Sequence, residues 1–190
     1  TDTVFATDLI SLITTSIQEP LRKINTSLLG TVILYSLGNL LFTFGIHQTV
    51  IYGTILEPLL LVNMNENMAA AAVGQEIPHI INLSFVPTFG LIGGSGSTIC
   101  LLIALFLVYR HNEQYMELGK LAIAPSIFNI NEPVIFGFPI VFNLPMIVPF
   151  VLTPTIGIII AYFATTLGFI NKCSVLVPWT TPPLLSLIHI

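Results

Sequence analysis

The residues best suited to chemistry lie in one short segment, where a carboxylate stands among amides and a proline. Glu132 is the only formally charged residue between Leu121 and Asn171. Asn129 and Asn131 precede it, and Pro133 follows it. A lone carboxylate in so apolar a stretch is costly to bury. An acid, two amides and a helix break in an apolar chain therefore indicate a polar-solute site inside a membrane protein.

Glu132 could accept hydrogen bonds from a substrate hydroxyl, act as a general base, or carry a transported proton. A structural alternative is a protonated acid that only ties two helices together. Because Pro133 disfavours helical geometry at the residue before it, the segment is predicted to be extended or turn-like. In such a segment Asn129 and Asn131 can point the same way, whereas on a helix they would diverge. We therefore expect both amides and the acid to contact the substrate.

His47 is the second candidate for substrate binding. It stands at the end of a charge-free run that begins at residue 24. Imidazole can donate and accept hydrogen bonds, and it can carry a proton. The alternative is a hydrogen-bonded core residue. Gln48 beside it and Asn39 upstream favour the polar site.

Two further segments each allow two interpretations. The run Gly93–Ser97 precedes Thr98 and an apolar stretch, so Ser97 and Thr98 are predicted to open a helix. Its N-terminus could bind an anion such as a phosphate, or the glycines could serve close helix packing. No lysine follows the run, so it matches no Walker pattern. Trp179 is predicted to anchor the membrane interface, with stacking on a flat substrate face as the alternative.

Composition requires most of the surface to face lipid. Hydrophobic residues make up 54% of the chain and charged residues 7%, with a mean hydropathy of +0.94. Ordinary soluble domains carry roughly 25% charged residues. The net charge of −4 and the absence of a basic patch give no indication of a nucleic-acid partner. Cys100 and Cys173 have no metal-ligand spacing and are predicted to be core residues, and we expect no metal or cofactor.

Gaps between charges predict an all-α, polytopic membrane bundle. No Asp, Glu, Lys or Arg occurs in residues 24–56, 77–109 or 133–171. Each gap is too long for one span and contains glycine or proline, so we expect a full span plus a re-entrant segment in each. The polar stretches 65–76 and 110–120 are predicted to be loops.

An amphipathic helix is expected over residues 8–25, where isoleucine and leucine recur at helical spacing. It would lie at the membrane surface, or alternatively form a soluble linker helix. Residues 28–183 would hold the spanning and re-entrant segments of a single transport domain. The chain starts without methionine and ends in an apolar stretch, so we expect a part of a larger membrane protein. From the residues alone this is a transporter of a small polar solute, and an ion-coupled secondary transporter or a structural subunit stays open.

Four ordered segments resemble the membrane IIC subunit of phosphotransferase-system (PTS) sugar permeases, in the lactose/cellobiose/N,N'-diacetylchitobiose branch. They are Gly45-Ile46-His47, Gly93-Gly94-Ser95-Gly96-Ser97-Thr98, Gly119-Lys120-Leu121-Ala122 with Phe128-Asn129-Ile130-Asn131-Glu132-Pro133-Val134-Ile135-Phe136-Gly137, and Pro178-Trp179-Thr180-Thr181-Pro182. The chain departs from the family pattern at Asn143-Leu144-Pro145 and in the tail after Pro183.

The resemblance implies a multi-pass protein of the bacterial cell membrane that is a homodimer when full length. This chain would be most of its C-terminal transport part, and the N-terminal dimerisation part and a final span would lie outside it. By the matching segments, Glu132 would lie near the sugar 6-hydroxyl and His47 would contact the sugar, a β-linked disaccharide or β-glucoside. The phosphoryl group would come from a phosphocysteine on a separate cytoplasmic IIB partner, so whether the chain counts as an enzyme is left open.

Overall fold

The computed structural model describes residues 19–187, and every regular element in that range is helical, which confirms the predicted all-α class. Of the predicted surface helix, residues 8–18 lie outside the described part of the chain. The elements are α2 (Glu19–Asn25), α3 (Leu28–Thr43), α4 (Thr49–Ile51), the π-helix η2 (Tyr52–Leu56), α5 (Glu57–Ala72), α6 (Phe85–Gly90), the 3₁₀ turn η3 (Ser95–Ser97), α7 (Ile99–Val108), α8 (Glu113–Ile127), α9 (Glu132–Gly137), α10 (Leu144–Thr166) and α11 (Pro183–Ser186).

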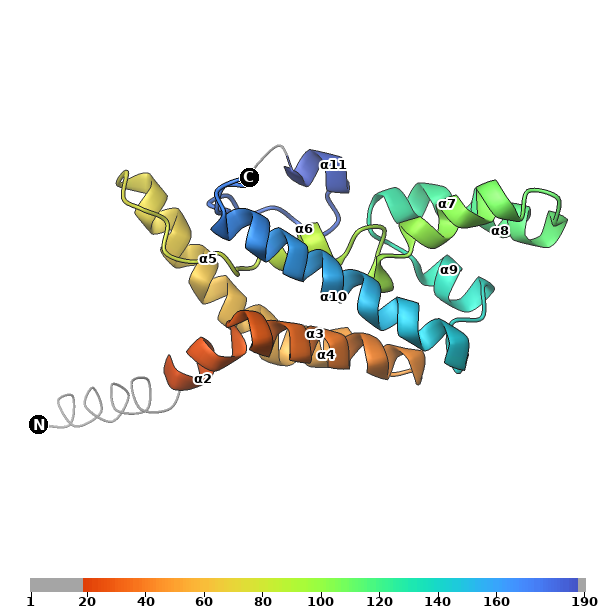
Figure 1. Ribbon diagram of the computed structural model, residues 1–190, viewed down its shortest axis with the longest axis horizontal. Helices are drawn as coiled ribbons and strands as arrows, with labels where there is room; N and C mark the ends of the chain where they lie inside the picture. The colour runs from red at the N-terminus through yellow and green to blue at the C-terminus, as the bar shows by residue number, and fades with distance from the viewer. Residues whose placement is uncertain (1–18, 188–190) are drawn as a thin grey trace, which may run out of the picture.

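The long helix α10 is the centre of the arrangement (Figure 1). It packs along α3 and also contacts α6 and η3. Figure 1 shows α5 reaching out at one end of the molecule, whereas α7 and α8 lie at the other end. Helix α6 and the glycine run therefore lie beside α10, near the middle of the fold.

Within residues 19–187, three stretches are long and apolar enough to cross a membrane, if each bent helix pair counts as one span. One is the straight helix α10, and the bent pairs are α2 with α3 (72°) and Phe85–Ser97 with α7 (52°). Large apolar side chains are exposed at regular helical spacing along α10: Leu144, Val148, Leu152, Ile156, Ile160 and Phe163. Such a face suits lipid contact. The bend at the glycine run agrees with the break predicted in residues 77–109. In residues 133–171, however, α10 runs unbroken through Pro149 and Pro154.

Both predicted polar loops are largely helical instead, and those two predictions are wrong. Helix α5 continues to Ala72 because the stretch Met68–Ala72 consists of strong helix formers. Helix α8 begins at Glu113, because the Asn112 side chain accepts a hydrogen bond from the backbone N–H of Tyr115 at 3.1 Å and caps it.

The two cysteines have different surroundings. Cys173 is buried in the apolar cluster around Phe85 and Ile158, as predicted. Cys100 is exposed on α7, so its assignment to the core is wrong. Cysteine is usually a buried residue. Helix α7 is apolar on every side, however, so its sequence does not show which face packs against the rest of the protein.

A charged cluster ties α2 to α5 and to the segment before α6. Arg22 contacts Glu66 at 2.6 Å and Glu19 at 2.9 Å, and His79 also bonds to Glu66. Helix α5 is outside the candidate spans. Burial alone would raise the pKa of Glu66, but the hydrogen bonds from Arg22 and His79 outweigh it and lower that pKa.

We expect Glu66→Gln in the full-length protein to reduce stability by about 1 kcal/mol or less at pH 7, since the side chain is 42% exposed to water. A lowered folded pKa stabilises the fold above the unfolded pKa of about 4.3 and loses that effect as the pH falls through the folded value. Thermal unfolding in detergent should therefore show a lower melting temperature for the mutant at pH 7 and convergence with the wild type in acid. Glu117→Gln, which breaks only an exposed pair with Lys120, is the matched control. A gap that persists at low pH would contradict this account.

Candidate functional site

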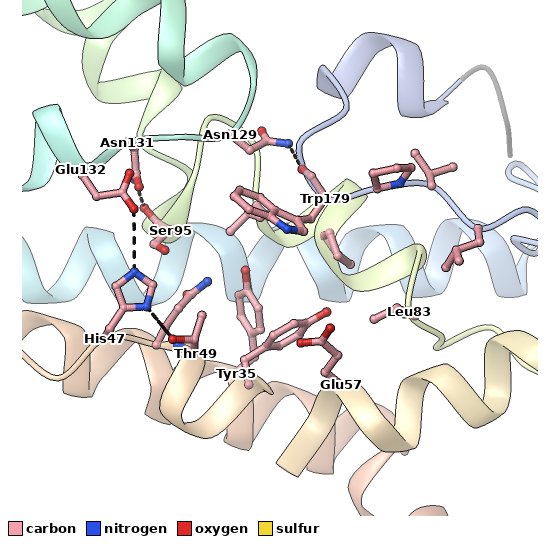
Figure 2. Close-up of a pocket in the computed structure, with 17 residues that line it drawn as sticks. Tyr35, His47, Thr49, Glu57, Leu83, Ser95, Asn129, Asn131, Glu132 and Trp179 are labelled. Carbon is pink, nitrogen blue, oxygen red and sulfur yellow. Dashed lines mark hydrogen bonds and ion pairs between the residues drawn. The ribbon is translucent and has the colours of Figure 1, made fainter. Parts of the chain in front are cut away.

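A cavity of about 500 Å³ opens between three parts of the fold (Figure 2). Its walls come from α3 to α5 on one side, and from the glycine run and the turn before α9 on another. The extended segment 176–179 completes it. The volume lies within the range of roughly 300–1,000 Å³ usual for small-molecule sites. His47, Asn129, Asn131 and Glu132 all line this cavity, so the structure brings the sequence-predicted site residues together.

Glu132 and His47 face one another across the cavity (Figure 2). The His47 Nε2 and Glu132 Oε1 atoms are 3.9 Å apart, and the two side chains are 45% and 51% exposed. Glu132 is the first residue of α9, so the expectation that it lies outside a helix is wrong. Pro133 occupies the first turn of α9, where the amide hydrogen that proline lacks is not needed.

The ring of His47 is held in one orientation. Its Nδ1 atom accepts a hydrogen bond from the Thr49 backbone N–H at 3.3 Å and lies 2.9 Å from the Thr49 hydroxyl. The ring also packs on Phe42, with centroids 4.5 Å apart. Because Nδ1 accepts, the proton of the neutral imidazole sits on Nε2. The pair therefore offers one donor and one acceptor to a hydroxyl that enters between His47 and Glu132.

Asn129 connects three segments of the wall. Its Oδ1 accepts from the Gly93 N–H at 2.9 Å, while its Nδ2 donates to the carbonyls of Trp179 at 2.6 Å and Thr181 at 3.1 Å. The backbone of Asn129 is left-handed, with φ 63°, which asparagine tolerates better than most residues. This agrees with the predicted non-helical geometry at this position.

Asn131 joins the same turn to the loop before α7. Its Nδ2 donates to the Ser95 carbonyl and to the Thr98 hydroxyl, both at 2.7 Å. Both amides are therefore engaged with protein groups, which makes them positioning residues for Glu132 and the cavity wall. Their predicted contact with substrate stays a prediction.

The glycine run serves close packing in this fold. Gly94 has φ +99°, and a Cβ there would lie 2.3 Å from Asn131 Cγ. Gly96 has φ +71°, and a Cβ there would lie 2.2 Å from Phe150 Cδ2. Thr98 precedes α7 as expected, but its hydroxyl donates to the Gly93 carbonyl at 2.8 Å and does not cap the helix. These contacts support the packing interpretation of the run.

Trp179 lines the cavity, and its indole lies opposite Tyr35 and Glu57 in Figure 2. It is 53% exposed. The stacking alternative thus gains geometric support over the interface anchor that the sequence favoured. Asn129 fixes the backbone at this point.

Sequence reasoning missed part of the cavity wall. Tyr52 and Glu57 line it, and so does Tyr35, whose hydroxyl donates to the Gly90 carbonyl at 2.9 Å. Two side-chain atoms in the wall, Gln48 Oε1 and the Tyr52 hydroxyl, are buried without a hydrogen-bond partner among residues 19–187. One signal was available in the sequence: Glu57 is the charge that ends the run in which His47 lies.

Comparison with known proteins gives a consistent picture. A family model described as "Phosphotransferase system, EIIC" matches residues 4–154. The lichenan permease IIC component of Bacillus subtilis (strain 168) is 39% identical over 168 residues, which are 88% of this chain and 37% of the relative. The cellobiose-specific EIIC component of Geobacillus stearothermophilus is 38% identical, over 93% of this chain and 40% of the relative.

A solved structure matches the fold. The crystal structure of the transporter ChbC, the IIC component of the N,N'-diacetylchitobiose-specific phosphotransferase system, has a TM-score of 0.87 and 40% identity. The match covers 92% of this chain and 40% of ChbC. The chain thus spans about two fifths of the length of these relatives.

Proposed function

The chain belongs to the phosphotransferase system EIIC family, and from this premise we propose that it forms the sugar-binding part of a membrane permease for β-linked disaccharides. Its relatives include components named for cellobiose, for lactose and for oligo-beta-mannoside, beside the diacetylchitobiose transporter. EIIC components are membrane permeases, and the exposed apolar face of α10 agrees with that setting.

The observation that carries the proposal is the shared cavity of Glu132 and His47. A carboxylate and an imidazole N–H lie 3.9 Å apart, and an exposed indole lines the same hollow. Sugars present hydroxyl groups at their edges and C–H groups on their faces. A hydroxyl can bond to Glu132 and His47 together while the ring stacks on Trp179.

In the reaction proposed, the sugar 6-hydroxyl lies beside Glu132 and attacks the phosphorus of a phosphocysteine on a separate IIB protein. An O–P bond forms, the S–P bond breaks, and the cysteine leaves as a thiolate. The hydroxyl proton passes to Glu132, if the carboxylate is a base, or to solvent, if it only orients the hydroxyl. Positioning and a nearby proton acceptor are what phosphoryl transfer requires of the protein.

The cysteines of this chain support a donor on another protein or domain. Burial raises the pKa of Cys173 to about 12, so its thiolate is scarce near neutral pH. Cys100 does not line the cavity that holds Glu132. Some relatives are EIICB components, which carry IIB on the same chain, for example the lactose-specific protein of Staphylococcus aureus (strain N315). We extend the proposal to a IIB partner and a homodimeric, multi-pass full-length protein.

The decisive experiment measures uptake of radiolabelled cellobiose, lactose and diacetylchitobiose by cells that express the full-length protein, with and without its IIB partner. The expected product is intracellular sugar phosphate, and it should vanish when IIB is omitted. Accumulation of unmodified sugar driven by a proton gradient would instead restore the ion-coupled transporter, which nothing in the family comparison supports.

A further inference from the structure

We propose that Gln48, Tyr52 and Glu57 hold the second ring of a β-disaccharide through the hydroxyl groups of that ring. The inference rests on the proposed function and adds which residues recognise the ring that is not phosphorylated. All three residues line the same cavity as Glu132. They come from one continuous stretch that runs from the start of α4 through η2 to the start of α5.

Two of the three side chains carry buried polar atoms that no group in residues 19–187 satisfies. Gln48 is 7% exposed, and its Oε1 atom has no hydrogen-bond partner among the described residues. The Tyr52 hydroxyl is also buried and has no hydrogen-bond partner among the described residues. Native folds rarely keep such atoms unless a ligand or water completes them. Both atoms are covered by neighbouring side chains, so a ligand hydroxyl satisfies them only when Gln48 and Tyr52 turn towards the cavity.

The local backbone explains how Tyr52 and Glu57 reach the same wall. The Glu57 N–H donates to the Tyr52 carbonyl across five residues, which is the hydrogen bond of a π-helix. On an α-helix, side chains five residues apart point to different sides. The wider turn of a π-helix brings them to the same side, one above the other. The π-helix η2 thus allows Tyr52 and Glu57 to line the same cavity.

The chemistry of the three groups selects hydrogen-bond donors. An ionised Glu57 and the Gln48 Oε1 atom can only accept, and the Tyr52 hydroxyl can do both. Glu57 forms no salt bridge within residues 19–187. A sugar ring supplies a donor on each hydroxyl, whereas a phenyl aglycone of similar size supplies none.

The positions of the residues separate this subsite from the reacting one. In Figure 2, His47 and Glu132 lie together at one end of the cavity, and Glu57 lies apart from them on the wall below Trp179. A ring whose hydroxyl meets Glu132 leaves the Glu57 region to the next ring along the ligand. Trp179 lies between the two regions and can contact either ring.

The test compares cellobiose with phenyl β-D-glucoside, which keeps the first ring and replaces the second with a ring without donors. Both are titrated into the detergent-purified full-length protein by calorimetry, and the preference is the ratio of the two dissociation constants. Loss of a buried ligand hydrogen bond changes affinity roughly fivefold to tenfold. Tyr52→Phe, Glu57→Gln and Gln48→Met should each shift the preference by that factor towards the phenyl glucoside.

Matched controls come from the same residue types outside the cavity. Tyr162→Phe and Glu113→Gln should keep the wild-type preference, because neither residue lines the cavity. Glu132→Gln should weaken both ligands together, since both carry the first ring. Three variants probe the subsite, and a thermal melt of each shows whether it is folded, so the loss of one variant to misfolding leaves two readouts.

The outcomes separate the inference from the function on which it rests. The assignment would be overturned if the ratio of the two dissociation constants stayed constant in all folded subsite variants. It would also be overturned if these variants lost affinity for cellobiose and phenyl glucoside by the same factor. If the wild-type protein binds none of cellobiose, lactose, diacetylchitobiose and phenyl β-D-glucoside, the proposed function itself fails. A shift in preference confined to the subsite variants supports the inference.

Discussion

Replacing Glu132 with glutamine in the full-length protein is expected to abolish phosphorylation-coupled sugar uptake. Glutamine keeps the shape and a hydrogen-bonding oxygen but removes the charge and the proton acceptor. The loss of a general base alone reduces rates by roughly 10²–10⁴-fold. Uptake of labelled cellobiose as its phosphate in cells measures the effect, and the sugar dissociation constant of the purified variant shows whether binding persists.

The two measurements together define the role of the acid. If the variant binds sugar but forms no sugar phosphate, Glu132 acts as the base. If the variant loses sugar binding as well as phosphorylation, Glu132 is the group that holds the hydroxyl. Glu113→Gln is the matched control, since Glu113 opens α8 and does not line the cavity. Normal formation of sugar phosphate by the Glu132 variant would refute the assigned role.

The second large effect is expected for Gly94→Ala. The new Cβ would lie 2.3, 2.5 and 2.6 Å from three atoms of the Asn131 side chain, at a residue with φ +99°. The backbone strain adds roughly 1–2 kcal/mol. A displaced Asn131 amide leaves the Ser95 carbonyl without this donor and breaks the hydrogen bond to the Thr98 hydroxyl, which adds about 1–3 kcal/mol. We therefore expect a loss of about 3 kcal/mol and impaired sugar binding.

The chain offers a control for the strain alone. Gly74 also has a left-handed backbone, with φ +68°, but a Cβ there would meet nothing within 4 Å. Gly74→Ala should therefore destabilise the full-length protein by only about 1 kcal/mol. Thermal unfolding in detergent compares the two variants. Equal melting temperatures would mean that the contact with Asn131 adds nothing and would contradict the packing account of the glycine run.

The sequence alone predicted the all-helical class and the shared cavity of Glu132 and His47. Both predictions depend on charge, and charge is informative here because so little of it is present. A single carboxylate in a mostly apolar stretch of about fifty residues with no other charge leaves few physical explanations. The same reasoning failed for residues 65–76, where isolated polar residues sit on a helix whose alanines favour continuation.

The roles of the two asparagines could not be predicted from their neighbours in the chain. The partners of Asn129 lie 36 to 52 residues away, in segments that the sequence places in separate charge gaps. An amide next to an acid looks the same in a sequence whether it binds a ligand or a distant carbonyl. Trp179 posed the same problem, because both an anchor and a stacking platform call for an indole.

The π-helix η2 has a further consequence for how insertions and deletions affect the cavity wall. Each residue of an ordinary helix turns the chain by about 100°. Removal of a single residue between Tyr52 and Glu57 would restore ordinary winding and leave the two side chains four residues apart, which is the spacing of neighbours on one face of an α-helix. A lost codon at this point therefore keeps Tyr52 and Glu57 aligned, whereas α-helical winding at the present length would turn Glu57 away from Tyr52.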